Sequence, residues 1–209
     1  PLLPPLEGKR VLDLGCGFGW HCRYAAEHGA ESVMGVDLSE NMLGEARKRT
    51  SHANVTYLRS SIEDFPFPTE AFDLVISSLA FHYVRDFTAL CRNVRRSLPR
   101  NGDFVFSVEH PVFTAQGPQE WHGDEAGNRA HWPVDRYFEE GKRNAVFLGE
   151  QVVKYHRPLT AYVRALSQAG FAVTALVEPE PDPALLESCA EMADELRRPM
   201  MLIIAARAA

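Results

Sequence analysis

Three glycines alternate with other residues directly after a short apolar run. Arg10-Val11-Leu12-Asp13-Leu14 precedes the loop Gly15-Cys16-Gly17-Phe18-Gly19, and a helix-like segment follows. Glycine lets the backbone turn sharply and lets a ligand approach without meeting a Cβ atom. The pattern predicts a ligand-binding turn between a strand and a helix, although the same glycines also suit an ordinary tight turn.

The glycine spacing argues against a dinucleotide cofactor. A dinucleotide fold requires G-x-G-x-x-G, but the sixth position is Trp20 counted from Gly15 and Cys22 counted from Gly17. Asp37 ends the next apolar run, and a carboxylate there can accept hydrogen bonds from both hydroxyls of a ribose. Both nucleotide classes use such an acid, and Asp37 could equally cap a helix, so it does not separate them.

Two later stretches separate the nucleotide classes. Residues 61–68 (SIEDFPFP) and 71–84 (AFDLVISSLAFHYV) follow the glycine loop and Asp37, which makes four motifs in order. Over about residues 8–108 the chain resembles the class I methyltransferases that use S-adenosylmethionine, in their type 11 branch. The resemblance implies S-adenosylmethionine as the methyl donor, S-adenosylhomocysteine as the product, and a Rossmann-like fold.

The resemblance also implies which residues hold the donor. Leu38 and Ile62 pack on the adenine, and Ser61 stands where the family commonly has an aspartate that contacts the adenine amino group. His82 either helps to close the site or packs only for shape. The expected donor-binding residues are Asp13, Gly15, Cys16, Gly17, Gly19, Asp37, Leu38, Met42, Ser61, Ile62, Ser77, Ser78 and His82.

The methyl acceptor leaves fewer signals. The sequence 77–80 (SSLA) stands where enzymes that methylate amino groups of nucleic acids have an Asn/Asp-Pro-Pro-aromatic box, and neither Cys91 nor Cys189 follows a proline. The net charge of −6, from 22 basic and 28 acidic residues, also disfavours nucleic acid. We expect a small-molecule acceptor whose attacking atom is oxygen, nitrogen or carbon.

Four residues are candidates for catalysis. His110 follows the fifth predicted strand beside Glu109, and His156 ends a predicted hairpin beside Tyr155. A histidine can act as a base near neutral pH, with Glu109 or Tyr155 orienting the ring or the acceptor. Equally, Glu109 and His156 could only tie an insertion to the sheet. No metal is expected, because methyl transfer chiefly requires alignment and exclusion of water.

Alternating apolar runs and helical stripes predict an α/β fold, with a seven-stranded, mostly parallel sheet covered by helices on both faces. The last predicted helix starts at Asp182 and carries an inward stripe of five residues. The predicted strands are 10–14, 32–36, 55–58, 72–77, 104–108, 171–177 and 200–205, and that stripe is Leu185, Leu186, Cys189, Met192 and Leu196.

Residues 110–156 interrupt this alternation. They mix aromatic residues, histidine, glycine and proline without a clear period, apart from a predicted hairpin around Gly149. We predict one domain over residues 1–209, in which 110–156 form an inserted acceptor-binding lid after the fifth strand. The alternative is a structural cap whose aromatic residues fill a small core of their own.

Composition bears on the cellular environment of the protein and on which functions remain possible. Four scattered cysteines indicate neither a disulfide framework nor a zinc site and fit a reducing, cytoplasmic environment. No apolar run is long enough for a membrane span, so no membrane partner is expected, and the oligomeric state stays open. Residues 2–5 (LLPP) resemble the end of a longer segment, so a further N-terminal segment is expected. An NAD-dependent oxidoreductase and a non-catalytic nucleotide-binding protein remain alternatives.

Overall fold

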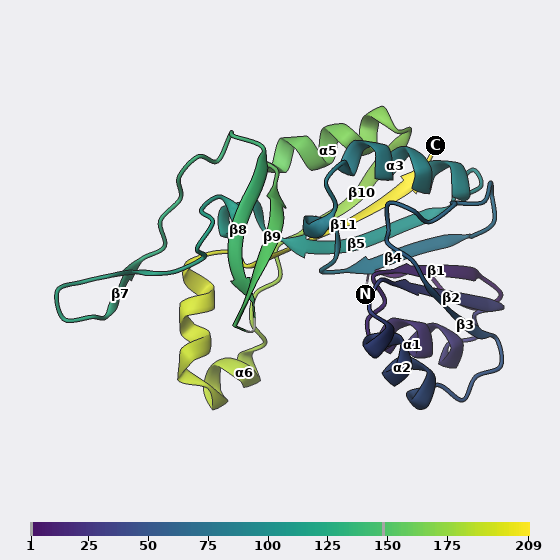
Figure 1. The fold of residues 1–209 in the computed structure, drawn as a ribbon, viewed down its shortest axis with the longest axis horizontal. Coiled ribbons are helices and arrows are strands. Elements are labelled where there is room, and N and C mark those ends of the chain that lie inside the picture. Colours follow the sequence, from purple (N-terminus) through teal and green to yellow (C-terminus); the bar gives the residue numbers. More distant parts are fainter. Residues whose placement is uncertain (1, 148) are drawn as a thin grey trace.

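The computed structural model describes residues 2–147 and 149–209 (Figure 1). Seven strands form one sheet in the order β10-β11-β5-β4-β1-β2-β3, and only β11 runs antiparallel to its neighbours. This confirms the predicted Rossmann-like, mostly parallel sheet. The strands are β1 (Arg10–Leu14), β2 (Ser32–Asp37), β3 (Val55–Arg59), β4 (Leu74–Ser78), β5 (Asp103–Glu109), β10 (Phe171–Val177) and β11 (Met201–Ala208).

Helices cover both faces of the sheet, as predicted. Helices α1 (Trp20–Glu27) and α2 (Glu40–Arg49) lie on one face, and α3 (Phe87–Ser97) and α5 (Leu159–Gln168) lie on the other (Figure 1). Side-chain caps fix two helix starts, because Ser39 accepts from the Met42 amide and Asp86 from the Ala89 amide. Within the described residues, no helix is both long and apolar enough to cross a membrane.

The insertion between β5 and α5 has its own small elements. It begins next to the carboxyl end of β5 and extends away from the sheet (Figure 1). The predicted hairpin is confirmed and begins earlier than expected, although Leu148 lies outside the described residues. The elements are α4 (Pro111–Thr114), β6 (His122–Gly123), β7 (Arg129–His131), β8 (Gly141–Phe147) and β9 (Glu150–His156).

The prediction of one long helix from Asp182 is wrong. Extended backbone at Cys189 (φ −137°, ψ 101°) divides the segment into α6 (Pro183–Ser188) and a 3-10 helix, η2 (Ala190–Arg197). Leu185 and Leu196 are 51% and 54% exposed, so the predicted stripe does not face a core. Helix α6 lies away from the sheet (Figure 1). The helical spacing of the apolar residues therefore does not reflect burial against the sheet.

Candidate active site

A cavity of about 290 Å³ opens where β1, β2 and β4 reach their carboxyl ends. This is the edge at which open α/β sheets bind ligands. Leu38 is 65% exposed, which leaves an apolar side chain available to a flat ring. The lining residues are Gly15, Asp37, Leu38, Ser61, Ile62, Glu63, Ala80, Tyr83 and Val84, and we call this cavity the donor pocket.

Asp37 joins the glycine loop to the start of α2. Its Oδ2 accepts a 2.9 Å hydrogen bond from the Gly17 amide, and its Oδ1 accepts one of 2.8 Å from the Ser39 amide. Each carboxylate oxygen has a second lone pair, so Asp37 can still accept hydrogen bonds from a ligand. The same residue can therefore hold the loop in place and bind a ribose.

Gly15 must be glycine for two independent reasons. Its φ of +74° is in the left-handed region, and a Cβ built on it would lie 2.4 Å from Ala80 Cβ. The loop thus leaves space in the donor pocket that any other side chain would fill. This cradle fits the close backbone approach that a bound nucleoside requires.

Three predicted donor residues play other structural parts. Asp13 is 1% exposed and accepts a 3.3 Å hydrogen bond from the Cys22 thiol, while its Oδ1 has no partner. Burial raises the pKa of Asp13 to about 7. Met42 is largely exposed on α2, and Ser61 Oγ donates to Asp64 at 2.7 Å. Ser61 lines the donor pocket, whereas Asp13 and Met42 do not.

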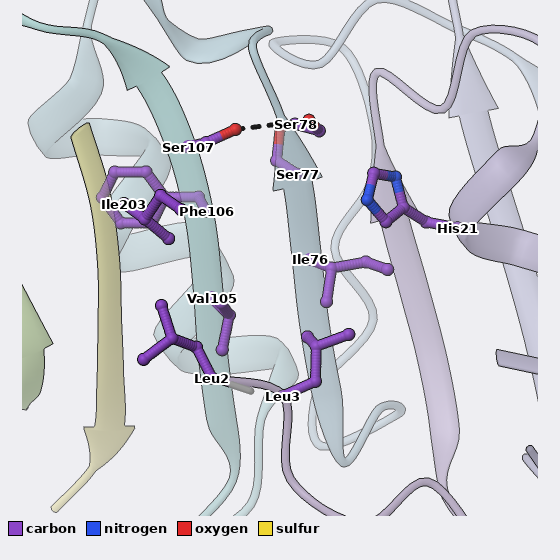
Figure 2. A pocket seen from close by; sticks show the side chains of 10 residues that line it. All are labelled: Leu2, Leu3, His21, Ile76, Ser77, Ser78, Val105, Phe106, Ser107 and Ile203. Atoms are coloured by element: carbon purple, nitrogen blue, oxygen red, sulfur yellow. Dashed lines mark hydrogen bonds between the residues drawn. The ribbon is translucent and has the colours of Figure 1, made fainter. Parts of the chain in front are cut away.

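Ser77 and Ser78 line a second cavity of about 340 Å³ on the α1 side of the sheet (Figure 2). Ser77 Oγ donates to the Leu14 carbonyl at 2.7 Å, and Ser78 Oγ lies 3.2 Å from Ser107 Oγ. Figure 2 shows His21 of α1 pointing toward β4. His21 was not predicted from the sequence, although its place just after the glycine loop was the available signal.

His82 lies beside the donor pocket in the 3-10 helix η1 (Phe81–Tyr83). It is buried, and its Nδ1 accepts a hydrogen bond of 3.4 Å from the Glu109 amide. Burial lowers the pKa of His82 to about 4, with the positive charges of Lys154 and Arg157 contributing. At neutral pH the ring is therefore uncharged, with its proton on Nε2.

Glu109 forms a buried ion pair with a residue of the insertion. Its Oε1 lies 2.6 Å from Lys154 Nζ, and its Oε2 accepts a 2.8 Å hydrogen bond from Gln119. Lys154 is only 2% exposed. Neither Lys154 nor Gln119 was predicted from the sequence as a site residue. The available signal was the alternation in β9, which places Lys154 and His156 on one face of the strand.

The two histidines predicted as bases sit in different surroundings. His110 caps α4 by accepting from the Val112 amide at 3.0 Å, and its Nε2 lies 2.9 Å from Glu178 Oε1. His156 is fully buried between Thr114 Oγ1 and the Tyr137 carbonyl, each 2.8 Å from a ring nitrogen. The alternative for Glu109 and His156 was that they tie the insertion to the sheet, whereas the contacts of His156 join two parts of the insertion to each other.

Burial lowers the pKa of both histidines. For His110, the charge of Glu178 opposes this effect. Tyr155 is half-buried and alternates along β9 with Lys154 and His156, so it faces the other side of the hairpin. The structure therefore brings Glu109 to His82 and Lys154 instead of gathering the four predicted catalytic residues into one cluster.

Comparison with known proteins decides the family. Residues 12–106 match the model of a methyltransferase domain. A solved Mesorhizobium loti structure, an S-adenosylmethionine dependent methyltransferase, is 45% identical, with a TM-score of 0.91 over 98% of this chain and 93% of that one. A Listeria monocytogenes structure assigned to the same enzymes is 53% identical, with a TM-score of 0.96 over 100% and 93%. The chain belongs to the class I S-adenosylmethionine-dependent methyltransferases, type 11 branch.

The methyltransferase also resembles larger enzymes over part of their length. It is 33% identical to the tRNA U34 carboxymethyltransferase of Hahella chejuensis across 85% of this chain, which spans 49% of that protein. The donor identified by the family fits the cradle at Gly15 and the carboxylate of Asp37. The class I resemblance and the methyl donor inferred from the sequence are confirmed.

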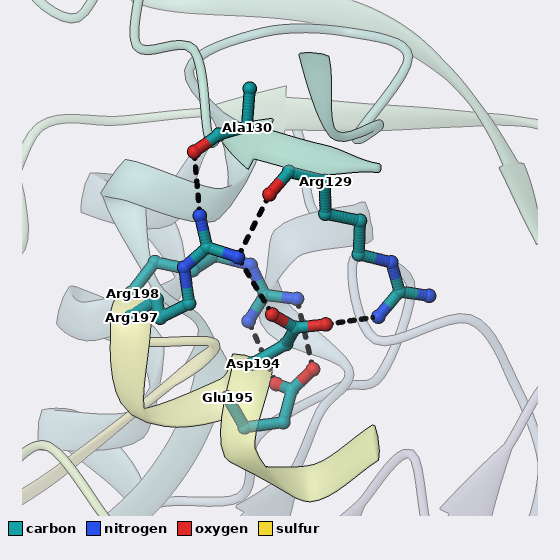
Figure 3. A network of polar contacts seen from close by, with 6 residues as sticks. All are labelled: Arg129, Ala130, Asp194, Glu195, Arg197 and Arg198. Atoms are coloured by element: carbon teal, nitrogen blue, oxygen red, sulfur yellow. Dashed lines mark hydrogen bonds and ion pairs between the residues drawn. The ribbon is translucent and has the colours of Figure 1, made fainter. Parts of the chain in front are cut away.

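In this methyltransferase three aromatic residues of the insertion, Phe113, Trp121 and Trp132, lie around an arginine. Arg198 stacks on Trp132 and Phe113, with its guanidinium carbon 4.4 and 4.8 Å from the ring centroids. Glu195 pairs with Arg198, and the neighbouring Arg197 bonds Asp194 and two backbone carbonyls of the insertion (Figure 3). These contacts fasten the insertion to the segment before β11.

Proposed function

We propose that this methyltransferase transfers the methyl group of S-adenosylmethionine to a small-molecule acceptor bound between the donor pocket and residues 110–156. One observation carries the proposal. Strand β9 of the insertion packs against η1, and Tyr83 of η1 lines the donor pocket. An acceptor between the two would lie at the carboxyl edge of the sheet, where α/β folds bind ligands.

The donor would be held by backbone and side-chain groups of the pocket. Asp37 would accept hydrogen bonds from the ribose, and Leu38 and Ile62 would cover the two faces of the adenine. The loop from Gly15 to Gly17 would contact the methionine part through its backbone. When bound, S-adenosylmethionine supplies a methyl group already activated by a positively charged sulfur. The protein then has to align the acceptor and exclude water.

Proton removal divides the acceptors into two groups. A hydroxyl or a protonated amine benefits from a base, for which His110 and His156 are the candidates, with Glu109 or Tyr155 as the orienting group. A carboxylate or a neutral amine can attack without one, by proximity and desolvation alone. The bonded ring nitrogens of His156 favour the second group.

The proposal is tested with radiolabelled S-adenosylmethionine and three acceptor pools: small-molecule cell extract, total tRNA, and buffer alone. Label is expected in the small-molecule pool, and Asp37→Asn should reduce it when the concentration of S-adenosylmethionine is below saturation. The tRNA pool matters because the Hahella chejuensis relative is named for a tRNA nucleoside. Transfer to tRNA alone would overturn the small-molecule acceptor. Calorimetric binding of NAD without binding of S-adenosylhomocysteine would favour the oxidoreductase alternative.

A further inference from the structure

Two charged residues connect the insertion to the wall of the donor pocket. The first is Lys154 of β9, which reaches Glu109 at the end of β5. The second is Arg157, directly after β9, whose guanidinium donates to the Val84 and Arg85 carbonyls. Val84 lines the donor pocket. The same stretch of the insertion is thus fastened to the pocket wall at two points.

The Lys154–Glu109 ion pair carries a large desolvation cost. Both ions lose most of their hydration, since the side chains are 2% and 14% exposed. Replacing a buried ion pair by apolar residues is often neutral or stabilising. The packing of β9 against η1 therefore does not by itself require these charges. A buried pair does fix register and orientation, because either charge alone is strongly unfavourable there.

The pair also lies next to His82. The Glu109 amide donates to His82 Nδ1, so the residue that receives Lys154 also fixes the ring orientation in η1. Tyr83, the next residue, lines the donor pocket. A displacement of β9 would thus act on Glu109, and through Glu109 on the wall that faces the donor.

We propose that Lys154 and Glu109 form a latch between the insertion and the donor pocket, which makes Lys154 a positioning residue for methyl transfer. The latch rests on the proposed function, because it holds the proposed acceptor side of the site against the donor side. Donor binding reduces the local opening of η1, and through the latch it also reduces the local opening of β9. The acceptor surface is therefore in place only while the pair is intact.

Several groups surround the Glu109 carboxylate and bear on its charge. Lys154 comes from β9, His82 and Tyr83 from η1, and Tyr162 from α5, and the Gln119 amide bonds the second oxygen. Among these, Lys154 supplies the positive charge at bonding distance. Lys154→Met consequently leaves the Glu109 carboxylate buried without this positive charge, with the Gln119 amide still bonded to its second oxygen.

The test uses hydrogen exchange of the full chain with and without S-adenosylhomocysteine, so no acceptor is needed. In the unaltered protein, the ligand should slow exchange both in η1 and in β9. In Lys154→Met, protection of η1 should persist while exchange of β9 rises roughly tenfold. The matched control is Lys142→Met, an exposed lysine on β8 of the same hairpin, which should change neither segment.

A pH series separates a latch from simple packing. In Lys154→Met, exchange of β9, corrected for the intrinsic rate, should depend on pH, because protonating Glu109 removes the unpaired charge. The double variant Glu109→Gln/Lys154→Met should lose that dependence. Unchanged β9 exchange in Lys154→Met, or equal pH dependence in both variants, would overturn the latch. If the unaltered protein does not bind S-adenosylhomocysteine, that result would instead contradict the proposed function.

Discussion

The backbone amide of Gly17 donates a 2.9 Å hydrogen bond to the Asp37 carboxylate. The glycine loop and the acid at the end of β2 are therefore one unit, although 20 residues separate them in the chain. This bond connects two motifs that are separate in the sequence, and Gly15 and Asp37 both line the donor pocket.

Asp37→Asn should weaken binding of S-adenosylhomocysteine. Each charge-assisted hydrogen bond to a ribose hydroxyl contributes about 1.5 to 3 kcal/mol, so the dissociation constant should rise by about ten- to a hundredfold or more. Isothermal titration calorimetry measures it directly. Glu45→Gln, an exposed carboxylate on α2, is the control and should bind as the unaltered protein does. Equal affinity in both variants would remove Asp37 from the donor site.

Gly15→Ala should destabilise the protein more than an alanine substitution at another glycine with positive φ. Gly8 also has a positive φ of +68°, but no atom lies within 4 Å of its Cβ position. Gly8→Ala should therefore cost only the backbone strain, about 1 to 2 kcal/mol. Gly15→Ala adds the clash with Ala80 and should also abolish S-adenosylhomocysteine binding. Urea unfolding and calorimetry of the two variants give the comparison, and equal losses of stability with retained binding would contradict it.

Asp13→Asn should alter how stability depends on pH. Because the folded-state pKa of Asp13 is raised to about 7, the folded protein binds this proton more tightly than the unfolded chain does. The resulting stabilisation is fully present below about pH 4 and is lost as the pH rises through 7. Asparagine lacks this loss, so the stability of the variant relative to the unaltered protein should rise from pH 4 to 7.

His82 also contributes to the pH dependence of stability, so Asp13→Asn has to be compared with the unaltered protein at each pH. Its pKa is lowered to about 4, so its contribution is present above the unfolded-state value near 6.5 and is lost as the pH falls toward 4. The two residues oppose each other between pH 4 and 6.5. Urea unfolding of both proteins at pH 4.5, 6 and 8 isolates Asp13. A difference that does not vary with pH would mean that Asp13 is ionised throughout.

His156→Ala should destabilise the protein without affecting the donor. The substitution leaves Thr114 Oγ1 and the Tyr137 carbonyl without their partner in a buried site, at a cost of about 2 kcal/mol or more. Thermal unfolding should show a lower midpoint, while S-adenosylhomocysteine binds as before. His122→Ala, an exposed histidine of the insertion, should stay within about 0.5 kcal/mol. An unchanged midpoint, with a pH–rate profile that loses one limb on the identified acceptor, would restore His156 as the base.

The sequence predicts the sheet well because the signals for its strands are local. A buried parallel strand is apolar along its whole length, as in Leu74-Val75-Ile76. The glycines of the loop after β1 likewise predict a turn from their own positions. The prediction for the segment after Asp182 was wrong because it needed information that is not local. Its apolar spacing suits a helix, but whether Leu185 meets a core depends on what tertiary structure lies beside it.

The donor pocket was more predictable than the acceptor side for the same reason. Gly15 and Asp37 lie in motifs whose spacing is fixed by consecutive elements, because Gly15 follows β1 and Asp37 ends β2, with α1 between them. The Lys154–Glu109 pair joins residues 45 apart. The alternation in β9 places Lys154 on the same face as His156, but it does not show that this face meets Glu109. Long-range ion pairs are set by the packing of whole elements, which a local pattern does not specify.

A crystal structure of the chain with S-adenosylhomocysteine would show directly whether the donor lies in the donor pocket. We expect the ribose hydroxyls on the Asp37 carboxylate, the adenine between Leu38 and Ile62, and the sulfur directed toward the edge where Glu109 meets Lys154. A ligand bound outside the donor pocket, or one whose sulfur points away from the insertion, would contradict this expectation.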